Sequence, residues 1–144
     1  MRSVVAASLL LLSAFGLARA ATPALEVSDA WVRAVPGSSV AAAYFSVRNP
    51  GSHAVRILSV SSPAARGAMI HDSSVVNGQS TMRPHGQLSL APGQALSLSP
   101  GGMHVMLTDL VRPLSPGEHV PLVLDLGGGI VQTLSATVRP LDAP

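Results

Sequence analysis

Two residue types that can bind a soft metal ion recur in the middle of this chain. His71, Met82, His104 and Met106 stand out because the 144-residue sequence contains no cysteine. Thioether sulfur favours Cu(I), whereas imidazole accepts copper and zinc. Structural zinc sites use cysteine and histidine, and blue-copper centres require a cysteine thiolate. The four residues therefore favour a single Cu(I) ion held by two histidines and two methionines.

A hairpin is expected to bring the first two of these residues together. Asn77-Gly78 lies between two extended runs, which is a strong signal for a two-residue turn. The opposed pairs are then Val76 with Gln79, Ser73 with Met82, Asp72 with Arg83, and His71 with Pro84. In this register His71 and Met82 are diagonal neighbours on one face, about 7–8 Å apart at Cα. Their long side chains can converge on one ion.

The other two residues are expected on one face of a strand over residues 103–110. Side chains alternate along a strand, so His104 and Met106 share a face, with Cα atoms about 6.5–7 Å apart. Met103, Val105 and Leu107 form the opposite, apolar face, which predicts that they lie in the core.

The remaining histidines and methionines have weaker claims. A single methionine in a β domain is usually core filler, and a single strand histidine is usually solvated. Met69 shares the face of His71 and is a reserve ligand. His85, near the hairpin end, is a peripheral group or simply exposed, and His53 and His119 are expected in solvent beside turns.

The scaffold that holds these residues is expected to be entirely β. Helical periodicity is absent, and short extended runs are separated by Pro-Gly and Asn-Gly turns. Such spacing predicts an all-β sandwich or barrel. The expected strands cover residues 25–35, 41–48, 55–60, 68–76, 79–83, 87–90, 95–98, 103–110, 120–126 and 130–138.

Residues 1–20 are predicted to be a cleavable signal peptide, followed by one domain over residues 21–144. Met1-Arg2 precedes an apolar run, and Ala18-Arg19-Ala20 fits the small-x-small cleavage pattern. The apolar run is shorter than the roughly 20 residues that span a bilayer, so stable membrane insertion is not expected. A lipoprotein is not expected either, because no cysteine is present to carry a lipid. The predicted location is the periplasm.

Charge argues against nucleic acid as a partner. Removal of Arg2 and Arg19 with the signal peptide reduces the nine arginines to seven, which equals the seven acidic residues. No run of basic residues is present to follow a phosphate backbone.

The spacing of the four residues resembles that of the periplasmic copper chaperones of the PCu(A)C type. Their pattern is His, ten residues, Met, twenty-one residues, then His-x-Met, and His71, Met82 and His104-Val105-Met106 match it. Residues 30–33 (AWVR), 42–45 (AAYF) and 100–107 (PGGMHVML) are also similar to the family.

The resemblance implies a cupredoxin-like or immunoglobulin-like β-sandwich after the signal peptide, with copper near the surface. It also implies delivery of Cu(I) to the CuA centre of cytochrome c oxidase, often together with a Sco-type protein. Two features depart from the family pattern. Asp72 and Ser73 follow His71 where many members have a methionine, and the His/Met-rich tail that takes Cu(II) in some members is absent.

Three further hypotheses remain beside a non-enzymatic Cu(I) chaperone. An extracytoplasmic copper buffer or resistance protein without a dedicated acceptor would have the same site. A copper enzyme would generally need a His-rich site with an open position, and a metal-free sandwich for adhesion or assembly would ignore Cu(I).

Overall fold

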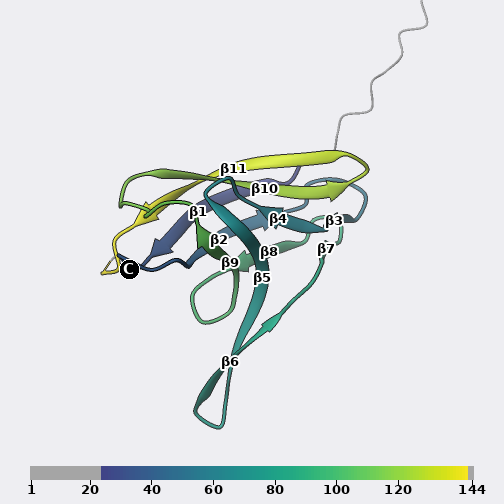
Figure 1. Ribbon diagram of the computed structural model, residues 1–144. Coiled ribbons are helices and arrows are strands. Elements are labelled where there is room, and N and C mark those ends of the chain that lie inside the picture. The colour runs from purple at the N-terminus through teal and green to yellow at the C-terminus, as the bar shows by residue number, and fades with distance from the viewer. Residues whose placement is uncertain (1–23, 143–144) are drawn as a thin grey trace, which may run out of the picture.

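The computed structural model describes residues 24–142, and these residues form β-strands without a helix (Figure 1). The strands are β1 (Glu26–Ala34), β2 (Ala41–Arg48), β3 (Val55–Ile57), β4 (Ser59–Ser61), β5 (Ala65–Val76), β6 (Gln79–Pro84), β7 (Leu88–Leu90), β8 (Ala95–Leu98), β9 (Met103–Leu110), β10 (His119–Gly127) and β11 (Ile130–Arg139). Within this part of the chain no helix could cross a membrane. The signal peptide expected at residues 1–20 lies outside the described residues.

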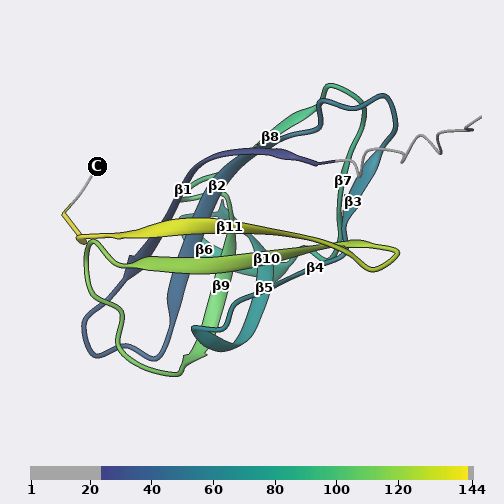
Figure 2. The same cartoon turned by 90° about the horizontal axis from the view of Figure 1, so that it is seen from above.

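Most strands belong to one mixed sheet. Its order is β4-β10-β11-β1-β2-β9-β5-β6, and β8 also pairs with β2, while β3 and β7 form a separate two-stranded sheet. β1 and β11 pair in parallel, whereas the other strand pairs are antiparallel. In two perpendicular views, β10 and β11 cross the direction of β1, β2 and β9 (Figures 1 and 2). The expected all-β sandwich is confirmed.

Alternating side chains from both halves of the sheet fill a single core. Phe45 of β2, Leu107 of β9, Leu122 of β10 and Val138 of β11 are almost completely buried. Burying such side chains contributes about 1.5–3 kcal/mol each, and the fold relies on this core because the sequence has no cysteine to form disulfides.

A bulge in β1 decides which of its residues face this core. Asp29 has a φ of 52°, and the register with β2 shifts by one residue between Ser28 and Trp31. An extra residue in one strand reverses the alternation beyond it. Val27 and Val32 therefore both face the core, and Trp31 lies on the opposite face, directly beside Tyr44.

One expected strand is divided in two. Residues 55–60 were expected to form a single strand, but Leu58 interrupts it, and its N–H donates to the Asp125 carbonyl at 2.8 Å. β3 pairs with β7 in the small sheet, whereas β4 pairs with β10 at the edge of the large one. The prediction was wrong here because the extended run over residues 55–60 carries no local signal for a change of sheet.

The β5–β6 hairpin extends away from the body of the domain (Figure 1). Asn77 and Gly78 have φ angles of 51° and 77°, which the primed hairpin turn requires. The register is the predicted one: Val76 pairs with Gln79, Ser73 with Met82, Asp72 with Arg83, and His71 with Pro84. A local turn signal was therefore sufficient to set the register along the hairpin.

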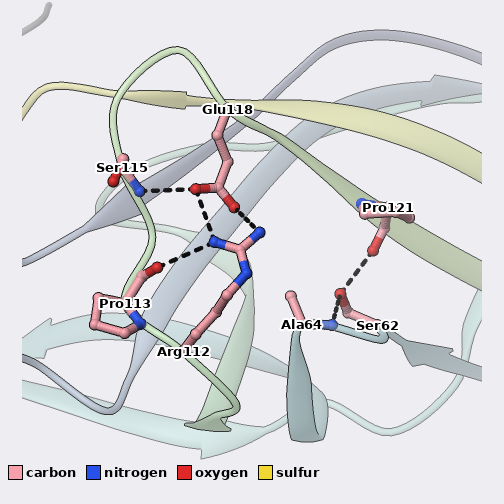
Figure 3. Close-up of polar contacts among 7 residues, drawn as sticks. All are labelled: Ser62, Ala64, Arg112, Pro113, Ser115, Glu118 and Pro121. Carbon is pink, nitrogen blue, oxygen red and sulfur yellow. Dashed lines mark hydrogen bonds and ion pairs between the residues drawn. The ribbon is translucent and has the colours of Figure 1, made fainter.

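Polar contacts fix the loops on the opposite side of the fold (Figure 3). Arg112 forms an ion pair with Glu118 at 2.6 Å, and the Ser115 N–H donates to the same carboxylate at 3.0 Å. The Ser62 hydroxyl donates to the Pro121 carbonyl at 2.7 Å, which ties the loop after β4 to β10. The contacts of Glu118 hold the connection between β9 and β10, which follows the end of β9 farther from His104.

Candidate metal centre

The two candidate histidines lie directly opposite each other. β5 pairs with β9 so that His71 faces His104, and their ring centroids are 5.8 Å apart with an interplanar angle of 83°. Directly opposed residues place their side chains on the same face of a sheet. The pairing of β5 with β9 therefore brings His71 of the hairpin next to His104. Local sequence signals alone did not predict this pairing.

His104 is buried and held in one orientation. Its side chain is 5% exposed, and its Nδ1 lies 3.2 Å from the Gly102 carbonyl oxygen. A carbonyl oxygen can only accept, so Nδ1 carries the proton in this contact and Nε2 keeps its lone pair. Such a backbone contact fixes the tautomer and ring direction of a metal-binding histidine.

His71 has an imidazole nitrogen without a partner. Its Nδ1 is buried, and it forms no hydrogen bond within the described part of the chain. A buried polar atom without a partner is destabilising by about 1–3 kcal/mol. A metal ion bound at this nitrogen would remove that penalty, so the donor chemistry fits a ligand.

The candidate methionines border the same face. Met106 lies two residues after His104 and pairs directly with Met69 of β5, whereas Met82 faces Ser73 across the hairpin. Met82 and Met69 are 55% and 52% exposed. A cavity of about 230 Å³ is lined by Met82, His104, Met106, Ser73, Ala42 and Tyr44, among others. Three of the four predicted residues thus border one cavity, and the fourth, His71, contacts the ring of His104.

Met103 and the three remaining histidines lie where the sequence predicted. Met103 packs against the core, on the face opposite His104. His53, His85 and His119 are exposed. Met69, which the sequence predicted as a reserve ligand, pairs directly with Met106 across β5 and β9. It therefore lies beside one of the four predicted ligands.

Two aromatic residues on this face were not predicted as part of the site. The rings of Trp31 and Tyr44 lie 4.5 Å apart, and the Tyr44 ring lies 6.4 Å from that of His104. Burial raises the pKa of the Tyr44 phenol above its usual value, and the charge of Arg33 partly opposes this shift. Alternation along residues 41–48 could have predicted that Tyr44 lies on the other face of the strand from Phe45. The position of Trp31 could not be predicted in this way, because it depends on the bulge at Asp29.

Residues 24–142 contain no group of three or more histidine, aspartate or glutamate side chains arranged to hold a metal ion. Two imidazoles with nearby thioethers match the donor set that Cu(I) prefers.

Solved structures of copper-binding domains share this fold. The copper-bound PCuAC domain from PmoF2 superposes with a TM-score of 0.65 at 23% identity, covering 80% of this chain and 92% of that one. Cu(I)-bound DR1885 from Deinococcus radiodurans has a TM-score of 0.58 and 30% identity, with 78% and 76% covered. The predicted likeness to the PCu(A)C family is confirmed.

Sequence comparison gives the family of the chain. Residues 25–138 match the family described as "Putative lipoprotein LpqE-like". The protein "Putative lipoprotein Lxx21020" of Leifsonia xyli subsp. xyli is 33% identical over 116 residues, which cover 80% of this chain and 69% of that protein. The chain therefore belongs to the LpqE-like family. Both descriptions use the word lipoprotein, although the sequence here contains no cysteine.

Proposed function

We propose that this protein is a periplasmic copper chaperone that binds one Cu(I) ion through His71, Met82, His104 and Met106. The observation that carries the proposal is the direct opposition of His71 and His104, each with an imidazole nitrogen that has no partner among residues 24–142, beside Met106. The protein is a carrier and not an enzyme, as expected of a PCuAC-type domain.

The comparisons support copper as the cargo. Cu(I)-bound DR1885 is 30% identical to this chain over most of its length. Two histidines and two methionines would hold Cu(I) without a thiolate, so the site would survive an oxidising compartment in which thiols form disulfides. The exposure of Met82 would leave one ligand accessible to a receiving protein.

Membership of a family described as lipoproteins supports an extracytoplasmic location at the cell envelope. The basic start, apolar run and Ala18-Arg19-Ala20 of the N-terminus favour export with cleavage. The periplasm is therefore the proposed location.

The proposed acceptor is the CuA centre of cytochrome c oxidase, reached directly or through a Sco-type protein. A deletion strain separates this role from that of a copper buffer. A chaperone predicts loss of oxidase activity at low copper, restored by added copper. A buffer predicts normal oxidase activity and sensitivity to high copper.

Anaerobic titration of Cu(I) against a competing chelator tests the binding site. The wild-type protein is expected to bind one equivalent, and Met82→Ala and His104→Gln to bind at least tenfold more weakly. His85→Ala, which removes an exposed histidine near the end of the hairpin, is the matched control and should keep the wild-type affinity. Failure to bind one equivalent, or unchanged affinity in both site variants, would overturn the proposal.

A further inference from the structure

Two arginines lie on the same sheet face as the proposed copper ligands. Arg33 of β1 and Arg139 of β11 are direct partners in the parallel pair. The Arg33 guanidinium carbon lies 5.4 Å from the centre of the Trp31 ring and 6.0 Å from that of Tyr44, and the Arg139 guanidinium carbon lies 4.8 Å from Trp31. Both cations therefore cover the buried aromatic pair beside His104.

Neither arginine is paired with a carboxylate side chain. All seven aspartates and glutamates of the sequence fall within residues 24–142. The ion pairs in this part of the chain join Arg48 with Glu26 and Arg112 with Glu118. Attraction to the ring faces holds the guanidinium groups in place, but it leaves the five N–H donors of each group without a carboxylate partner among residues 24–142.

The arginines are close to the copper ligands. Arg33 pairs with Ala42, and Ala42 pairs with Met106 on the next strand. Neighbouring strands lie about 4.8 Å apart, so Arg33 and Met106 are separated by about 10 Å at the backbone. Ala42 carries a single methyl group and leaves the surface between them open.

We propose that Arg33 and Arg139 form a docking contact for a carboxylate-rich surface on the protein that receives the copper ion. This inference rests on the proposed function. Ligand exchange requires the receiving protein to cover the face that carries Met82 and Met106, and a partner on that face also covers the arginines. Covering two unpaired cations is unfavourable unless the partner supplies opposite charge. Carboxylates there would accept bidentate hydrogen bonds and steer the encounter.

Transfer of Cu(I) to two chelators of different charge tests this role. The acceptors are bathocuproine disulfonate, which is anionic, and neocuproine, which is uncharged. The double variant Arg33→Gln/Arg139→Gln is expected to slow transfer to the anionic chelator about tenfold at low salt. It should leave transfer to neocuproine unchanged, and added salt should remove the difference.

A matched variant controls for net charge. Arg56→Gln/Arg66→Gln also removes two cations, here fully exposed ones, which lie on β3 and at the start of β5. It should leave both transfer rates within twofold of the wild type, and Arg33→Lys/Arg139→Lys should keep most of the preference for the anionic chelator. Equal slowing towards both chelators, or no slowing at all, would overturn the inference.

A copper-free measurement separates this inference from the proposed function. Trp31 is the sole tryptophan, so its fluorescence reports on the two cations above it. Titration of the apo protein with poly-L-glutamate should change this fluorescence saturably in the wild type and in Arg56→Gln/Arg66→Gln. It should have no effect in Arg33→Gln/Arg139→Gln. A protein that binds Cu(I) but gives the same response in all three would refute the docking contact alone.

Discussion

His71 on β5 and His104 on β9 are directly opposed residues of one antiparallel pair, and their ring centroids lie 5.8 Å apart. Their relative position is fixed by backbone hydrogen bonds between two strands, rather than by a flexible loop. A site built on rigid elements keeps its ligands in place before the ion arrives. In the proposed site, Met82 and Met106 would then supply the adjustable part of the coordination.

The sulfur atoms, and not the size of the side chains, should determine copper affinity. Met106→Leu and Met82→Leu are expected to lower Cu(I) affinity at least tenfold each, because leucine offers no donor atom. Met103→Leu, on the same strand but on the core side, should leave affinity unchanged. Each exchange conserves volume and should alter stability by less than about 1.5 kcal/mol. Chelator competition and urea unfolding measure the two effects separately, and a similar loss of affinity in all three would contradict the assignment.

The hairpin turn should be sensitive to its backbone conformation. A Cβ on Gly78 would meet no neighbouring atom, but its φ of 77° is unfavourable for other residues. Gly78→Ala is therefore expected to destabilise the fold by about 1–2 kcal/mol. Asn77→Gly should change stability little, since glycine adopts the observed φ of 51° readily. Urea unfolding of both variants measures their free energies of unfolding. Equal values for Gly78→Ala and Asn77→Gly would refute this prediction.

Acid should weaken the loop between β9 and β10. The hydrogen bond from Arg112, together with that from the Ser115 N–H, holds the pKa of Glu118 below its usual 4.5. A depressed carboxylate pKa stabilises the folded state above the unfolded-state pKa, and this contribution is lost as pH falls through the folded-state value. Glu118→Gln should lower stability at neutral pH and converge with the wild type at low pH. Thermal unfolding between pH 7 and pH 3 measures this, and a constant difference would contradict it.

Core packing under the site should dominate stability. Leu107 is fully buried and lies one residue beyond Met106 on the opposite face of β9. Leu107→Ala should cost about 2–5 kcal/mol through lost burial and a residual cavity. Val131→Ala, at a side chain that is 62% exposed, should change stability by less than about 0.5 kcal/mol. Equal effects in urea unfolding would show that β9 is not packed as described.

Local signals in the sequence were sufficient for part of this structure. The Asn77-Gly78 turn set the register of His71 and Met82, and alternation separated His104 from Met103 correctly. The pairing of distant strands leaves no local signal in the sequence. The direct opposition of His71 and His104 was therefore visible only in the structure. The same holds for the pairing of Met69 with Met106 across β5 and β9.

Two backbone irregularities also escaped prediction. The bulge at Asp29 turns Trp31 away from the core, and the break at Leu58 transfers the chain between sheets. Both depend on which strands lie alongside, which an apolar pattern does not specify. The position of Trp31 beneath Arg33 and Arg139 was missed for the first of these reasons.

X-ray absorption at the copper edge of the Cu(I)-loaded protein tests the central claim most directly. The account predicts one Cu(I) with both imidazole nitrogen and thioether sulfur in its first coordination shell. The sulfur contribution should fall in Met82→Leu and in Met106→Leu but stay constant in Met103→Leu. A shell without sulfur, or one that neither Met82→Leu nor Met106→Leu alters, would contradict the site.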